Sequence, residues 1–115
     1  MTAKREYLDY LQDIFESIGD IEVFVAGMDF ERFATDKRTV NAVIRSLEVI
    51  GEAAKKIPKD ISDAHPGVPW SKMCAMRDKL THEYFGVDRT ILWKVATEEI
   101  PPLKDVFRKI LEEHR

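Results

Sequence analysis

Three residues in the second half of the chain have side chains that could act on a phosphodiester. Arg77, His82 and Tyr84 occur in the run Arg-Asp-Lys-Leu-Thr-His-Glu-Tyr. An arginine presents a planar fork of donors to phosphate oxygens and keeps its charge at working pH. An imidazole can take a proton from a ribose 2′-hydroxyl or give one to a leaving oxygen. A tyrosine can stack on a base or present a hydroxyl. This set suits RNA chemistry that needs no metal ion.

The spacing decides which of these side chains share a face of a helix. Each helical residue turns by about 100°, so Arg77 and His82 would point roughly 140° apart on a regular helix. Asp78 and His82, at i and i+4, share a face, so Asp78 could orient the imidazole. Arg77 and Tyr84, seven residues apart, also align. This geometry suits a site that a second copy of the helix completes across a dimer interface, but solvated or capping groups have the same spacing.

Helical segments must position these side chains, because apolar residues recur along the chain with helical periodicity. Asp36 and Asp88 are the expected N-caps of the second and fourth helices, and the pair Pro101-Pro102 should kink or split the fourth. Residues 28–35 are a connection with room for one short turn, and residues 58–68 are expected to be a loop. The four expected helices cover residues 3–26, 36–57, 69–84 and 88–111.

Four long helices with short connections predict an all-α fold, an antiparallel four-helix up-and-down bundle with a kinked or split last helix. The chain has 115 residues, which is the length of one domain, so residues 1–115 are expected to form a single helical domain. Small bundles often dimerise to cover leftover apolar surface, and a homodimer is expected here.

Composition limits the classes of function. The net charge of −3 excludes a globally basic nucleic-acid binder, so RNA contact would need a local patch. No apolar run reaches the ~18 residues of a membrane span, and the single cysteine, Cys74, fits the reducing cytoplasm. His65, His82 and His114 lie far apart, and with one cysteine they give no recognisable zinc spacing. We therefore predict a cytoplasmic protein without metal or cofactor.

Several segments resemble one known family. Residues 77–84 resemble the R-x-x-x-x-H-x-Y motif of the HepT toxins, within the HEPN superfamily. Residues 43–56 look like the second-helix signature of that family, and residues 65–70 look like its loop before the third helix. Residues 85–88 and 92–93 resemble its entry into the fourth helix. Together these segments cover nearly the whole chain in the order of the family.

The resemblance implies a specific function. Such HEPN proteins are homodimeric helical bundles and metal-independent ribonucleases, with arginine and histidine from both subunits in a cleft at the interface. HepT is the toxin of a toxin–antitoxin system, and its partner MntA, a small nucleotidyltransferase, silences it by transferring AMP to the motif tyrosine. By position, Arg77 and His82 are the catalytic pair and Tyr84 is the modified residue. The family most often has asparagine where this chain has Asp78, and we expect this polar replacement to be tolerated.

The helix before the motif carries further candidates. Arg45, Glu48 and Glu52 recur at helical spacing. They are either a solvated face or residues that support the catalytic pair from a neighbouring helix. Gly51 is expected to let helices pack closely. Lys55 belongs to a group of lysines that could bind RNA but that serve more often for solubility.

Two further interpretations remain open. In the first, the dimer is a non-catalytic adaptor or a nucleotidyl acceptor for an MntA-like partner. In the second, the bundle is purely structural and its polar motif is a solvated surface. The RNA target, the cleaved bond and the stoichiometry with the antitoxin do not follow from the sequence.

Overall fold

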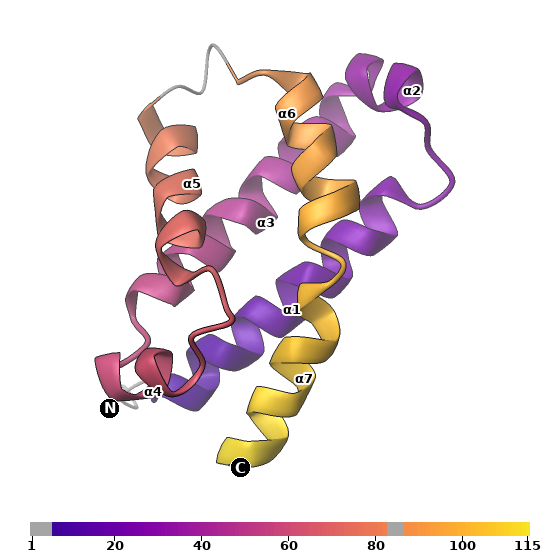
Figure 1. Ribbon diagram of the computed structural model, residues 1–115. Coiled ribbons are helices and arrows are strands. Elements are labelled where there is room, and N and C mark those ends of the chain that lie inside the picture. The colour runs from indigo at the N-terminus through magenta and orange to yellow at the C-terminus, as the bar shows by residue number, and fades with distance from the viewer. Residues whose placement is uncertain (1–5, 83–86) are drawn as a thin grey trace, which may run out of the picture.

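The structure is a computed structural model that describes residues 6–82 and 87–115, and at residues 81 and 82 it describes the backbone alone. Within that part of the chain every regular element is a helix and none is a strand. This confirms the predicted all-α class. The elements are α1 (Tyr7–Val25), α2 (Phe30–Thr35), α3 (Lys37–Lys55), α4 (Lys59–Ala64), α5 (Trp70–His82), α6 (Arg89–Lys94), the π-helical turn η1 (Val95–Glu99) and α7 (Leu103–His114) (Figure 1).

The helices begin where the sequence supplies caps. The Asp36 carboxylate accepts the backbone N–H of Thr39 at 3.1 Å and starts α3. The Asp88 carboxylate accepts the backbone N–H of Thr90 at 2.8 Å and starts α6. Each contact satisfies a backbone donor that the first turn of a helix leaves unpaired. Both predicted caps are confirmed, and so is the predicted split of the last helix, because Pro101-Pro102 separates η1 from α7.

Two segments differ most from the prediction. The N-cap of α1 is Glu6, whose side chain forms a reciprocal capping box with Asp9, so the helix starts later than residue 3. The expected loop 58–68 contains the short helix α4. Pro58 precedes it with φ −59°, an angle close to that of a helix, and the Pro58 carbonyl accepts the N–H of Ser62. A six-residue helix has too few periodic positions to be recognised from sequence.

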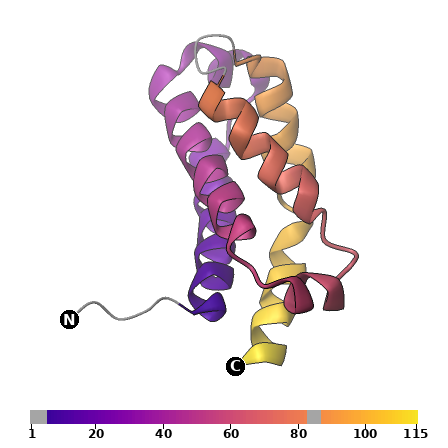
Figure 2. The same ribbon diagram turned by 90° about the vertical axis from the view of Figure 1, so that its left-hand side faces the viewer.

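Helix α1 is the centre of the packing, with α3 along one side and α7 along another, and α5 packs on α3 (Figures 1 and 2). Leu11, Ile14, Ile18 and Ile21 of α1 are fully buried, and burying each such side chain contributes about 1.5–3 kcal/mol. This arrangement is compatible with a helical bundle.

The two tryptophans anchor the outer helices to this core. Trp70 of α5 meets Phe107 of α7 edge to face, with ring centroids 5.6 Å apart. Trp93 of α6 lies against Phe33 of α2 at 5.1 Å. Aromatic pairs in these arrangements stabilise the packing of the outer helices. Among the described helices, none is both long enough and apolar enough to cross a bilayer.

Candidate active site

Arg77 is positioned by a close approach of α5 to α3. A Cβ atom added to Gly51 of α3 would lie 2.2 Å from Cβ of Arg77 and 2.8 Å from the carbonyl oxygen of Met73. Carbon atoms in good contact are about 3.5–4.0 Å apart, so no larger residue fits between these two backbones. Gly51 therefore lets the helices pack closely, as predicted. The stem of Arg77 is held against the α3 backbone, which limits where the guanidinium can reach.

Charged groups from both helices meet beside Arg77. The carboxylate of Asp78 forms an ion pair with the ammonium of Lys55, one turn after Gly51 on α3. Nη1 of Arg77 lies 3.4 Å from Oδ1 of Asp78. The Lys55 hydrogen bond, helped by the charges of Lys55 and Arg77, lowers the pKa of Asp78 below its usual value. Asp78 is therefore a carboxylate at neutral pH, fixed between a cation from each helix.

The pair remains within reach of a ligand. The side chain of Arg77 is 33% exposed and that of Asp78 is 48% exposed. A ligand in solvent can therefore approach the guanidinium while the stem of Arg77 stays packed.

The rest of the predicted constellation is only partly described. Helix α5 extends to His82, so the backbone is helical through the interval between Arg77 and His82. The side chain of His82 and all of Tyr84 lie outside the described residues. The predicted contact between Asp78 and His82 lies outside them too and stays a prediction. Lys55, one of the lysines expected to serve mainly for solubility, is the α3 partner of Asp78.

The supporting residues predicted on α3 have mixed surroundings. Glu48 is half-buried, whereas Arg45 and Glu52 are exposed. Between these three side chains and Arg77 or Asp78, the described part of the chain has no hydrogen bond or ion pair. Their supporting role stays a prediction.

Comparison with known proteins assigns this chain to a family. The family model described as "Ribonuclease HepT-like" matches residues 14–110, which include α3, α5 and the Arg77 site. The chain belongs to the ribonuclease HepT-like family. The resemblance identified from the motifs is thereby confirmed.

Several relatives match the HepT-like chain over nearly its full length. A protein of Thermococcus cleftensis named "Probable ribonuclease HepT" is 54% identical over 107 residues, which cover 93% of this chain and 97% of that protein. A "Putative RNase" of Methanocaldococcus jannaschii is 47% identical over 96% of this chain and 91% of its own. A "Putative RNase" of Caldanaerobacter subterraneus is 42% identical over 92% and 95%. No solved structure matches the chain significantly.

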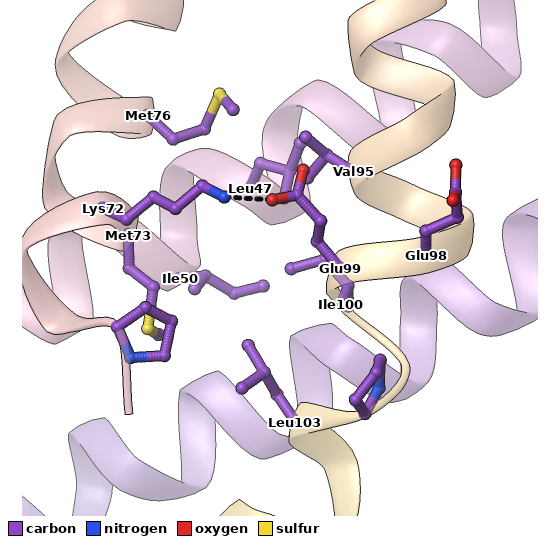
Figure 3. Close-up of a pocket in the computed structure, with 12 residues that line it drawn as sticks. Leu47, Ile50, Lys72, Met73, Met76, Val95, Glu98, Glu99, Ile100 and Leu103 are labelled. Carbon is purple, nitrogen blue, oxygen red and sulfur yellow. Dashed lines mark hydrogen bonds and ion pairs between the residues drawn. The ribbon is translucent and has the colours of Figure 1, made fainter. Parts of the chain in front are cut away.

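The protein also has an apolar pocket beside α5. It has a volume of about 320 Å³ and lies between α5, η1 and the start of α7, with α3 behind it (Figure 3). Met73 and Met76 line its α5 side. Lys72 and Glu99 form an ion pair across it, which neutralises two of its charged groups. Neither Arg77 nor Asp78 is among the described residues that line this pocket, so the recess is separate from this pair.

Cys74 lies one turn before Asp78 and is half-buried. Burial raises the pKa of its thiol, and the charge of Asp78 adds to this while that of Lys55 opposes it. A raised pKa keeps the thiol protonated, which does not suit a nucleophile.

Among the described residues, those best placed to hold a metal ion lie away from Arg77. His65, after α4, and His114, at the end of α7, have their Nε2 atoms 3.0 Å apart, with Glu113 close by. Sequence spacing had assigned these histidines no role, since they are 49 residues apart.

Proposed function

We propose that this protein is a metal-independent endoribonuclease in which Arg77 and His82 carry out the cleavage. The observation that carries the proposal is the placement of Arg77, held on the α3 backbone at Gly51 and flanked by the Lys55–Asp78 ion pair. Membership of the ribonuclease HepT-like family and relatives named as ribonucleases support it.

In this mechanism the ribose 2′-hydroxyl attacks the adjacent phosphorus and the bond to the 5′-oxygen breaks, which leaves a 2′,3′-cyclic phosphate and a 5′-hydroxyl. Arg77 binds the phosphate and offsets the charge that builds on it. His82 transfers the proton as general base or acid, a contribution of ~10²–10⁴-fold. Asp78 orients His82 while its own charge is balanced by Lys55 and Arg77.

We propose that the active unit is a homodimer of single-domain, antiparallel four-helix bundles. Helix α5 packs mainly on α3, and Ser71 and Ala75 are exposed on it. Small side chains let a second α5 approach closely, which would bring two copies of the Arg77 motif to one cleft. Arg45, Glu48 and Glu52 on α3 would then support that cleft.

The proposed biological role is that of a cytoplasmic toxin in a toxin–antitoxin system. An MntA-like minimal nucleotidyltransferase would neutralise it by AMPylation of Tyr84. Tyr84 follows Arg77 by seven residues in the motif, and we propose that an AMP phosphate added to it would reach the guanidinium. It would take the place of an RNA phosphate and repel the substrate.

The test is RNA cleavage by the purified protein made without a partner. We expect Arg77→Ala and His82→Ala to abolish cleavage while chromatography with light scattering still reports a dimer. The matched control is Lys79→Ala, an exposed cation on the same helix, which should keep most activity. Full activity of His82→Ala, or activity that a chelator abolishes while circular dichroism shows that the protein stays folded, would contradict the mechanism.

A second measurement addresses the adaptor interpretation. Intact mass should show an added AMP when the protein is made together with the nucleotidyltransferase, and none in Tyr84→Phe. If the unmodified wild-type dimer cleaves no RNA but still accepts AMP, the protein is a nucleotidyl acceptor and not a nuclease.

A further inference from the structure

We propose that His65, Glu113 and His114 form a binding site for a divalent transition metal ion of the zinc class. The Nε2 atoms of the two histidines lie 3.0 Å apart. Nε2 of His65 lies 3.6 Å from Oε2 of Glu113, and all three ligand atoms fall within 4.8 Å of one another. Two ligands each about 2.0–2.2 Å from a tetrahedral zinc ion are roughly 3.3–3.6 Å apart. Small side-chain shifts would therefore let all three atoms bind one ion.

The donor set decides the class of metal. Two imidazole nitrogens and one carboxylate oxygen are ligands that zinc and its first-row neighbours accept, whereas calcium and magnesium prefer oxygen ligands throughout. Three protein ligands leave a fourth tetrahedral position for water. We therefore expect zinc or cobalt to bind and magnesium not to compete.

The surroundings hold the two histidines in place before any ion arrives. The indole Nε1–H of Trp70 donates to the backbone carbonyl of His65 at 3.0 Å, and Trp70 itself packs on Phe107 of α7. The ring of Tyr7 meets His114 edge to face at 5.8 Å. The side chain of His65 is only 16% exposed. Fixed ligands lose less freedom on binding, so this rigidity favours a metal site.

The site is separate from the proposed catalytic centre. The segment after α4 and the end of α7 lie at one end of the molecule, and α5 runs from that end toward the other (Figure 1). An ion here would join the α4–α5 connection to the last turn of α7. Such an ion would stabilise the fold, and its binding does not depend on the proposed ribonuclease activity.

A hydrogen bond between two neutral imidazoles would also explain the 3.0 Å contact, so the experiment must separate the two. The full chain, dialysed against a chelator and then freed of it, is titrated with ZnCl₂ by calorimetry and with CoCl₂ by visible absorption. We expect one ion per chain and the absorption bands of tetrahedral cobalt. Removing a residue that only hydrogen-bonds to a metal ligand typically weakens metal binding by roughly 10–100-fold. His65→Gln and His114→Gln each remove a ligand itself, so each should weaken binding at least as much.

Two matched controls make the result specific. His82→Gln removes the remaining histidine and should bind the ion like wild type. Glu113→Gln should weaken binding, whereas Glu112→Gln, its exposed neighbour, should not. Both glutamates are on the surface, so these variants remain informative if a histidine variant fails to fold.

Thermal unfolding supplies an independent readout. Zinc at about 100 times its Kd should raise Tm on the order of 10 °C in wild type and not in His65→Gln. Equal zinc affinity of wild type and the His65→Gln and His114→Gln variants would overturn the proposal. So would the absence of binding to wild type, which would leave the imidazole hydrogen bond as the explanation.

Discussion

Replacing Gly51 by alanine tests whether the contact between α3 and α5 positions Arg77. The new methyl carbon would start 2.2 Å from Cβ of Arg77 and 2.8 Å from the carbonyl oxygen of Met73. Neither atom is the end of a flexible side chain, so rotamer changes cannot relieve the overlap. To restore a carbon–carbon contact of about 3.5 Å, α5 must move away from α3 by roughly 1 Å.

The expected loss of stability is small and the expected loss of activity is large. Overpacking costs about 1–3 kcal/mol, and the better helix propensity of alanine returns about 1 kcal/mol, which leaves about 0–2 kcal/mol of destabilisation. A displacement of about 1 Å at a catalytic group can lower the rate about 10²-fold. Gly51→Ala should therefore fold at room temperature but cleave RNA far more slowly than wild type.

The assay pairs urea unfolding with RNA cleavage, and Gly19→Ala serves as the matched control. Gly19 is also inside a helix, but nothing lies within 4 Å of its added Cβ. Its replacement should stabilise the protein by up to ~1 kcal/mol and leave cleavage unchanged. If Gly51→Ala is as active as Gly19→Ala, the close approach does not position Arg77 and the reasoning is refuted.

Three further predictions concern single side chains. Lys55 lowers the pKa of Asp78 in the folded protein. The ion pair therefore stabilises the fold at pH values above about 4, the carboxyl pKa in the unfolded chain. This stabilisation is lost as the pH falls through the lowered pKa of Asp78 in the folded protein. Lys55→Gln should raise the pKa of Asp78 in a carbon-13 NMR titration and flatten this acid dependence; an unchanged pKa would contradict the ion pair. Because burial raises the pKa of Cys74, iodoacetamide at pH 8 should label the folded protein more slowly than the protein in urea, and equal rates would mean an exposed thiol. Asp36→Ala removes the carboxylate that accepts the backbone N–H of Thr39. It should lower the free energy of unfolding in urea by about 1 kcal/mol. An unchanged free energy would mean that the first turn of α3 needs no cap.

Most helices of this protein can be predicted because their signals are local. The caps Asp36 and Asp88 and the break at Pro101-Pro102 act on residues within one or two turns. Their effects can therefore be predicted from the residues next to them in the sequence. Helix α4 was missed for the same reason, since a helix of six residues shows little periodicity and depends on its surroundings. The motif from Arg77 onward was one basis of the family resemblance. The family model over residues 14–110 confirms that resemblance, and the roles of the motif residues stay predictions.

The contacts at both candidate sites could not be predicted, because they join residues distant in sequence. Lys55 and Asp78 are 23 residues apart, and His65 and His114 are 49 apart. No local spacing relates such pairs. They meet because the helices α1, α3, α5 and α7 bury their apolar faces against one another. This burial sets which helices are neighbours and how far each is shifted along the axis of the next.

The sequence by itself determined the helical class, the caps and breaks of the helices, and the residue types that could act on a phosphate. These follow from backbone hydrogen bonding and side-chain chemistry, which act over a few residues. Tertiary structure alone decided that Arg77 packs on α3 at Gly51 and that Lys55 forms an ion pair with Asp78. It also decided that His65 and His114, far apart in sequence, lie in contact. The physical reason is that close packing of helices fixes distances that chain connectivity leaves open.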